Sequence, residues 1–268
     1  MTNGTADRWS SGGAYESYIG RWSRLVAPRF LDWLALPPGA RWLDVGCGTG
    51  VVTEAILARA DPESVIGIDP SDAFVEHARA TVVSPRATFA TGTATATGVD
   101  DGAVDAVVSG LVINFVPDLG AALVEARRVT RPGGVVAGYV WDYASGMELL
   151  RHFWDAAVEL DPAAAALDEG IRFPDAAAGP LRDAFVGAGL DAVDVQPIDV
   201  PTSFETYDDL WAPFLSGTGP APAYVASLPE AGQVALRDRL RASVTEDTDG
   251  SIELVARAWA VRGTTPAT

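Results

Sequence analysis

The sequence has no lysine, one cysteine and two histidines among its 268 residues. The absence of lysine excludes a Walker phosphate-binding motif and Schiff-base chemistry, because both require a lysine amine. The single cysteine, Cys47, excludes an intramolecular disulfide and a cysteine-based zinc site. The two histidines, His77 and His152, are far apart in the sequence, so no metal site is predicted. This cysteine usage is typical of a reducing compartment, and we expect a cytoplasmic protein.

Basic charge and long apolar runs are also scarce. The 19 arginines stand against 36 acidic residues, which gives a net charge of −17. Because phosphate backbones are bound by basic surfaces, this balance argues against a nucleic-acid partner. No apolar run reaches the length of a membrane span, and no signal-peptide pattern is present, so no membrane partner is expected. The length fits one α/β domain with insertions and leaves the oligomeric state open.

Glycine is concentrated where the sequence is most informative, in the stretch Arg41 to Gly50. A short apolar run predicts a buried strand, a glycine-rich turn follows, and residues 51–60 have helical character, which together open a βαβ nucleotide-binding unit. Gly46, Gly48 and Gly50 are spaced more tightly than the dinucleotide fingerprint G-x-G-x-x-G. Asp44 would repel a pyrophosphate but suits an ammonium group. S-adenosylmethionine carries such an ammonium and has no phosphate.

Three more motifs follow in order: Gly67-Ile68-Asp69-Pro70-Ser71, Asp105-Ala106-Val107-Val108-Ser109 and Arg128-Val129-Thr130-Arg131-Pro132-Gly133-Gly134. With the glycine stretch, they resemble the class I S-adenosylmethionine-dependent methyltransferases, closely over about residues 15–142. The nearest subgroup is the small-molecule enzymes of the ubiquinone-biosynthesis type. The resemblance implies methyl transfer from S-adenosylmethionine to a small-molecule substrate by in-line displacement, with S-adenosylhomocysteine as the product.

The same resemblance implies an α/β fold: a Rossmann-like, seven-stranded, mostly parallel sheet with an antiparallel last strand, helices on both faces and a partly helical cap. We expect a disordered tail over residues 1–13 and a methyltransferase domain over 14–268, with cap insertions at about 143–178 and 204–246. Apolar spacing predicts a helix over 15–36. A second helix, N-capped by Asp118, is expected to stop at Pro132-Gly133-Gly134, before a strand over 135–140.

The predicted cofactor site is built around Asp69, which lies 19 residues past Gly50, where a ribose-binding acid is expected. Its alternative role is the N-cap of a helix starting near Ser71. The family has Gly-Asp-Ala where this chain has Gly92-Thr93-Ala94, so adenine would meet a hydroxyl in place of a carboxylate. The full set of predicted cofactor residues is Tyr18, Arg24, Asp44, Gly46, Cys47, Gly48, Gly50, Asp69, Pro70, Ser71, Phe74, Thr93, Ala94, Ser109 and Asn114.

Several of these residues have two interpretations. Arg24, with Arg21 as the alternative, is expected to pair with the methionyl carboxylate, or both lie on a packing helix. Phe74 either flanks the adenine or belongs to the core. Asn114 stands where the family often has histidine. It is expected either to bind the cofactor or the substrate, or to cap a turn.

The substrate is expected at aromatic residues that lie mostly outside the sheet, although such residues more often form core. The candidates are Tyr15, Asn114, Trp141, Tyr143, Trp154, Arg172, Trp211 and Phe214. His152 is the candidate general base, because its ordinary pKa of about 6.5 suits proton transfer near neutral pH; the alternative is a solvent-facing histidine. Two other functions stay open: a nicotinamide-dependent oxidoreductase, and a non-catalytic ligand-binding protein on the same fold.

Overall fold

The computed structural model describes residues 21–217 and 219–267, which form two compact units. The sheet unit comprises Ser23–Val140, Asp175–Ile198 and Ala258–Thr268, and the helical unit contains Trp141–Pro174 and Asp199–Arg257. The tail predicted over residues 1–13, and the candidates Tyr15 and Tyr18, lie outside the described residues.

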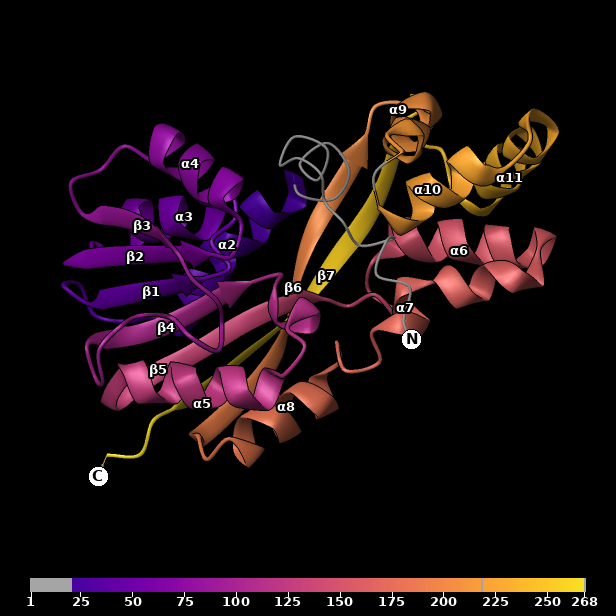
Figure 1. Cartoon of the computed structure of the whole chain (residues 1–268). Helices are drawn as coiled ribbons and strands as arrows, with labels where there is room; N and C mark the ends of the chain where they lie inside the picture. The colour runs from indigo at the N-terminus through magenta and orange to yellow at the C-terminus, as the bar shows by residue number, and fades with distance from the viewer. Residues whose placement is uncertain (1–20, 218, 268) are drawn as a thin grey trace. The chain divides into compact units, whose positions relative to one another are not determined.

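Along the first half of the chain the elements alternate between strand and helix, except that β4 follows β3 with no helix between them (Figure 1). Up to the end of the fifth strand they are α2 (Arg21–Leu34), β1 (Arg41–Val45), α3 (Val51–Arg59), β2 (Ser64–Asp69), α4 (Asp72–Thr81), β3 (Ala87–Thr91), β4 (Val104–Gly110), η2 (Ile113–Phe115), α5 (Leu119–Val129) and β5 (Thr130–Trp141). The remaining elements are α6 (Glu148–Leu160), η3 (Pro162–Leu167), α7 (Glu169–Arg172), α8 (Ala178–Gly187), β6 (Asp191–Phe204), α9 (Tyr207–Trp211), η4 (Ala212–Leu215), α10 (Pro220–Ser227), α11 (Glu230–Ser243) and β7 (Ile252–Thr264).

The seven strands form one sheet in the order β3-β2-β1-β4-β5-β7-β6. β1 pairs in parallel with β2 and β4, β2 with β3, and β4 with β5. β7 runs antiparallel to β5: Gly133 and Gly134 exchange backbone hydrogen bonds with Thr265, and just past the other end of β5 the Asp142 N–H donates to the Arg257 carbonyl. The predicted mostly parallel sheet with an antiparallel seventh strand is confirmed.

Helices cover both faces of the sheet unit. Figure 1 shows α2, α3 and α4 on one face and α5 and α8 on the other. On the first face, Val75, Ala78 and Val82 of α4 pack against Phe89 of β3 and against Cys47. Burial of such side chains stabilises the unit by about 1.5–3 kcal/mol for each large one. This packing holds the glycine turn, which includes Cys47, against the sheet.

Two predicted boundaries are wrong. α5 ends at Val129, ahead of Pro132, and Pro132-Gly133-Gly134 belong to β5 rather than to a helix stop. The pairing with Thr265 makes this segment a strand, and no pattern within the segment shows that partner. α2 ends at Leu34 because Ala35 adopts a left-handed φ of 48°, which an α-helix does not continue.

The helical unit is built around aromatic residues of α6. Phe153 stacks on Phe214 with ring centroids 4.4 Å apart, and its edge meets Trp154 at 5.0 Å. Tyr224 of α10 lies 5.9 Å from Trp154. These rings are buried, so they form a core of their own. In the part of the chain that is described, no helix is long and apolar enough to cross a membrane.

Candidate functional site

The glycine turn between β1 and α3 leaves one open position. Gly46, Gly48 and Gly50 have φ values of 72°, 52° and 94°, which side chains rarely adopt. A Cβ at Gly46 would lie 2.6 Å from Val112, and one at Gly50 would lie 2.6 Å from Val82. A Cβ at Gly48 would meet no described atom within 4 Å. Two glycines are therefore required by packing, whereas Gly48 leaves its backbone accessible to a ligand.

The Asp69 carboxylate is fixed beside this open position. Its Oδ2 accepts a hydrogen bond from the Gly48 N–H at 3.1 Å, and its Oδ1 accepts one from the Ser71 N–H at 2.9 Å. Burial raises the pKa of Asp69, and these two hydrogen bonds oppose the rise. Each oxygen keeps a further acceptor position, so the carboxylate matches a pair of hydroxyl donors. The N-cap of α4 is Ser71, which accepts from the Phe74 N–H at 3.4 Å, so the alternative role of Asp69 as N-cap is wrong.

Asp44, at the end of β1, is completely buried. Its Oδ2 accepts a hydrogen bond from the Thr53 hydroxyl at 2.7 Å, while its Oδ1 has no hydrogen-bond partner among the described residues. Burial raises the pKa of Asp44 to about 7, and the Thr53 hydrogen bond limits the rise. A cation near this carboxylate would favour its ionised form. The site thus holds an incompletely satisfied acceptor below the glycine turn.

Asn114 lies in η2, just past the carboxyl end of β4. Both polar atoms of its amide are buried, and neither has a hydrogen-bond partner in the described structure. The N-cap of η2 is Val112, so the turn-capping alternative for Asn114 is wrong. Leu111 has a left-handed φ of 61°, which costs free energy for a residue other than glycine. Backbone strain beside an unsatisfied buried amide is typical of a binding site.

The turn after β3 carries the residues predicted at the adenine. Thr93 and Ala96 exchange backbone hydrogen bonds of 3.3 and 3.1 Å, which closes the turn. The Gly92 N–H donates to the Asp69 carbonyl at 3.1 Å, so the turn begins beside the residue predicted to bind ribose. Thr93 is exposed, and Ala94 and Phe74 are half-buried. The sheet unit therefore brings these three residues to the same strand end as Asp69.

Other predicted cofactor residues have structural partners. Cys47 is buried, and its Sγ would lie 3.1 Å from a Cβ at Gly67; burial raises the pKa of its thiol. The Ser109 hydroxyl donates to the Val45 carbonyl at 2.9 Å and so joins β4 to β1. Pro70 is exposed at the end of β2.

Arg24 of α2 forms an ion pair with Glu54, at 2.8 Å between Nη1 and Oε2. Glu54 lies in the first turn of α3, where its N–H donates to the Gly50 carbonyl. The guanidinium is thus next to the helix that begins at the glycine turn. Its predicted pairing with a methionyl carboxylate stays a prediction, and the side chain of the alternative, Arg21, lies outside the described residues.

His152 belongs to the helical unit, where its Nδ1 lies 3.1 Å from the Ser243 hydroxyl. Because that hydroxyl donates to the Leu240 carbonyl at 2.8 Å, Nδ1 must be the donor to Ser243. That leaves Nε2 as the ring nitrogen that a base would use. His152 is half-buried, and its catalytic role stays a prediction.

Most of the predicted substrate residues are buried in the helical unit. Trp154, Trp211 and Phe214 contribute to its aromatic core, which favours the core interpretation for these three. The Tyr143 and Phe173 rings lie 5.5 Å apart, with the Arg172 guanidinium 5.3 Å from the Phe173 centroid. Separately, the Trp141 indole N–H is buried, and the described residues offer it no hydrogen-bond partner.

The sequence reasoning missed several buried carboxyl groups, and Glu169 is the one whose pKa is raised most clearly by burial. Glu169 is 4% exposed and accepts a hydrogen bond from the Trp154 indole N–H. Burial raises the pKa of Glu169 to about 7. Its only sequence signal is an acidic pair, Asp168-Glu169, which resembles many solvent-facing pairs. No group of three or more metal-ligating side chains occurs within the described ranges.

Comparison with known proteins finds one family that part of the chain is similar to. Residues 43–138 fit the model of a family described as "Methyltransferase domain". This segment is therefore similar to a methyltransferase domain. It spans the glycine turn, Asp69, the turn after β3 and Asn114, which are the features described above for the sheet unit.

Curated relatives share this sequence similarity, and a solved structure shares the fold. An uncharacterised methyltransferase of Mycobacterium tuberculosis is 37% identical over 133 residues, which is 50% of this chain and 51% of that protein. A 2-methyl-6-phytyl-1,4-hydroquinone methyltransferase of Synechocystis is 36% identical over 126 residues, covering 46% of this chain and 39% of that protein. Phosphoethanolamine N-methyltransferase 2 of Haemonchus contortus shares the fold, with a TM-score of 0.57, 16% identity, and coverage of 95% of this chain and 56% of the other. The chain thus spans about half, or less, of the length of these curated relatives.

Proposed function

We propose that this chain transfers the methyl group of S-adenosylmethionine to a small-molecule acceptor and releases S-adenosylhomocysteine. The observation that carries the proposal is the juxtaposition of the open Gly48 backbone with the fixed Asp69 carboxylate. A ribose offers two neighbouring hydroxyl donors, and the two oxygens of Asp69 offer the matching acceptors. The family match over residues 43–138 supports the same ligand.

The residues of the sheet unit fit this cofactor. Asp69 would hold the ribose, Thr93, Ala94 and Phe74 the adenine, and the backbone of the glycine turn the methionyl end. Asp44 would provide the negative charge for the ammonium group. Among the described residues its Oδ1 has no hydrogen-bond partner, and burial raises its pKa. Both properties are expected of a buried carboxylate that lacks a nearby cation.

When bound, S-adenosylmethionine supplies a methyl group made electrophilic by its sulfonium. The chain then has to hold an acceptor in line with the C–S bond and exclude water, and such positioning supplies most of the rate. Asn114 is the residue of the sheet unit best suited to orient a bound molecule, because its amide offers both donors and an acceptor that are otherwise unsatisfied. An oxygen nucleophile would also need a base, and Nε2 of His152 is our candidate.

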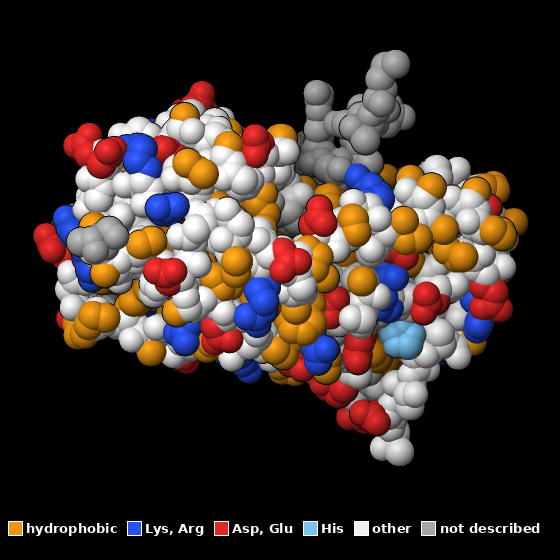
Figure 2. All heavy atoms as spheres, turned by 90° about the horizontal axis from the view of Figure 1, so that it is seen from below, with side chains coloured by type: hydrophobic (Ala, Val, Ile, Leu, Met, Phe, Trp, Pro, Cys, Tyr) orange, Lys and Arg blue, Asp and Glu red, His pale blue; other side chains and the backbone are white. Residues whose placement is uncertain are grey.

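We further propose an aromatic hydroxyl compound of the ubiquinone-biosynthesis type as the acceptor. The Synechocystis relative is named for a methylated hydroquinone, whose ring is flat and carries two hydroxyl groups. The face seen in Figure 2 carries acidic side chains interspersed with arginines, and the chain has a net charge of −17. A nucleic-acid acceptor is disfavoured by that charge.

The test has a binding arm and a turnover arm. Calorimetric titration of the purified chain should show binding of S-adenosylmethionine and S-adenosylhomocysteine, and none of NADH. Methyl-labelled cofactor should then transfer its label to members of a panel of hydroquinones and phenols. Binding of NADH in place of S-adenosylmethionine would favour the oxidoreductase alternative. Tight cofactor binding without label transfer to any acceptor class would favour the non-catalytic alternative.

A further inference from the structure

The turn predicted to hold adenine is anchored at both ends. At its start, the Gly92 N–H donates to the Asp69 carbonyl at 3.1 Å. At its end, Thr97 is 6% exposed and donates twice to Oε1 of Glu125, from its N–H at 3.0 Å and from its hydroxyl at 2.7 Å. Glu125 lies on α5, 28 residues further along the chain. One carboxylate of a helix therefore defines where the turn ends.

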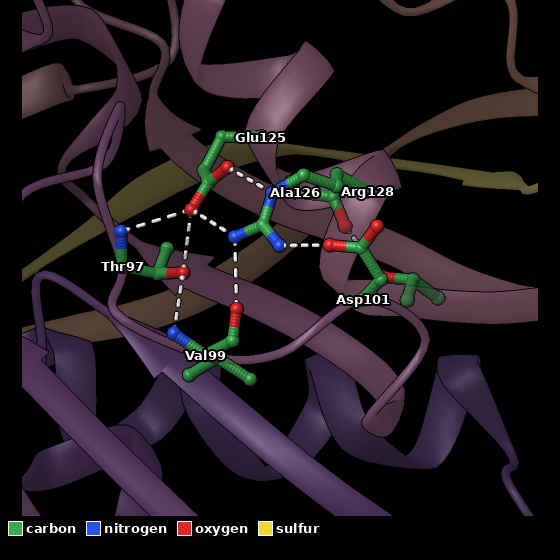
Figure 3. Close-up of polar contacts among 7 residues, drawn as sticks. Thr97, Val99, Asp101, Glu125, Ala126 and Arg128 are labelled. Carbon is green, nitrogen blue, oxygen red and sulfur yellow. Dashed lines mark hydrogen bonds and ion pairs between the residues drawn. The ribbon is translucent and has the colours of Figure 1, made fainter.

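The Glu125 carboxylate is itself held in place, as Figure 3 shows. Arg128, one turn further along α5, donates from Nε to Oε2 at 2.7 Å and from Nη2 to Oε1 at 2.8 Å. The Arg128 guanidinium also donates to the Val99 carbonyl at 2.8 Å and pairs with Asp101. The pKa of Glu125 is lowered to about 2 by the Arg128 and Thr97 hydrogen bonds, so the group is ionised throughout the neutral range.

The turn between the two anchors is otherwise open to solvent. Thr93, Thr95 and Ala96 are exposed, and the hydroxyls of Thr93 and Thr95 lie 3.4 Å apart. A short segment of small, exposed residues has little apolar surface to bury, so its position depends on the hydrogen bonds at its ends. A ligand that contacts the turn benefits when the turn is already ordered, because the ordering then costs nothing at binding.

We propose that Glu125 is a positioning residue for the adenine end of the cofactor, acting through Thr97 on the turn that carries Thr93 and Ala94. This inference rests on the proposed function, because it needs a cofactor at that turn. Thr93 itself brings no charge to the adenine. The charged group that orders this wall of the site is on α5, outside the contacts with the ligand.

Four variants separate this role from general stability. Thr97→Val removes the hydroxyl and keeps the shape, whereas Thr97→Ser keeps the hydroxyl. Glu125→Gln removes the charge while keeping one amide oxygen as an acceptor. Asp101→Asn is the matched control, because Asp101 contacts the exposed side of Arg128 and does not touch Thr97.

Two readouts are needed. The first is amide hydrogen exchange of residues 92–97 in the free protein, which should be faster in Thr97→Val and Glu125→Gln than in the parent, Thr97→Ser and Asp101→Asn. The second is calorimetric affinity for S-adenosylhomocysteine and for its inosine analogue, which differs only at the adenine edge. The loss of one or two hydrogen bonds that order the turn should weaken adenine-containing ligand binding about fivefold in Thr97→Val and about tenfold in Glu125→Gln.

Preference for the adenine form over the inosine form should fall in these two variants, and KM for S-adenosylmethionine should rise while kcat changes less than twofold. Parent-like affinities in both variants would overturn the positioning role, even if exchange increased. Equal losses for the adenine and inosine ligands would also overturn it, because they would indicate a general loss of stability. A parent chain that binds neither S-adenosylmethionine nor S-adenosylhomocysteine would overturn the proposed function, and this role with it.

Discussion

Replacing Asp69 by alanine removes the acceptor of the Gly48 and Ser71 N–H groups and, in the proposed complex, the acceptor of both ribose hydroxyls. Asp69 is 7% exposed, and its side chain lies at the carboxyl end of β2 rather than within the core. The substitution therefore has two separable consequences, one for folding and one for binding.

The effect on folding comes from two lost hydrogen bonds to a charged carboxylate. Each contributes about 1.5–3 kcal/mol, so together they amount to about 3–6 kcal/mol of the free energy of unfolding. Relief of the buried carboxylate, whose pKa is raised by burial, offsets part of this loss. Hydrogen bonds to a charged group contribute about 1.5–3 kcal/mol each, so two of them amount to about 3–6 kcal/mol of binding. Taking the lower end, we expect about a 100-fold weaker affinity for S-adenosylmethionine.

Calorimetric titration of Asp69→Ala with S-adenosylmethionine, alongside chemical unfolding, measures both quantities. Asp72→Ala is the matched control, because Asp72 is an exposed carboxylate three residues away that accepts a hydrogen bond from the Thr91 hydroxyl at 2.5 Å. This control should bind within about twofold of the parent, since its carboxylate lies at the solvent surface. An Asp69→Ala chain that stays folded and binds within threefold of the parent would refute the assignment of Asp69 to the ribose.

Three further predictions concern Asp44, Arg24 and His152. Burial raises the pKa of Asp44 to about 7, whereas the pKa of an aspartate in an unfolded chain is about 3.9. Between these two pH values the folded state keeps a proton that the unfolded state has released. The free energy of unfolding should therefore fall as pH rises from about 4 to about 7, and Asp44 should contribute at most about 1.4 kcal/mol per pH unit to that fall. Asp44→Asn should remove this contribution. If urea unfolding of the parent and the variant showed the same dependence of the free energy of unfolding on pH, the burial argument would be contradicted. Arg24→Gln should change the free energy of unfolding by less than about 1 kcal/mol, because the Arg24–Glu54 pair is about half exposed, yet weaken cofactor affinity about tenfold; unchanged affinity would exclude Arg24 from the cofactor site. His152→Ala should lower turnover at saturating cofactor about 100-fold with affinity retained, whereas turnover within threefold of the parent would leave methyl transfer to positioning.

The elements of the sheet unit followed from local patterns. The apolar run before Gly46, the interval to Asp69 and the Asp118 N-cap each depend on residues close in sequence, and β1 and the start of α5 occur where they were predicted. Asp118 does accept from the Ala121 N–H at 2.8 Å. Turn and cap chemistry is local, so a short window of sequence is enough to predict it.

Contacts between distant segments were not predictable in this way. The strand character of Pro132-Gly133-Gly134 depends on Thr265, and the position of Thr97 depends on Glu125. Nothing in the residues around Thr97 indicates a partner on α5. The aromatic residues of the helical unit were ambiguous for the same reason, because only packing shows that Phe153 and Phe214 stack on each other.

The sequence by itself therefore determined the order of strands and helices, the glycine turn and the acid that follows β2, since each is encoded by neighbouring residues. Only the tertiary structure decided which polar groups are satisfied. Thr53 satisfies one oxygen of Asp44 and leaves the other without a partner, and the amide of Asn114 is buried without one in the described structure. Burial and hydrogen bonding depend on groups brought together from distant segments, so unsatisfied atoms, which point to where a ligand binds, become visible only once the chain is folded.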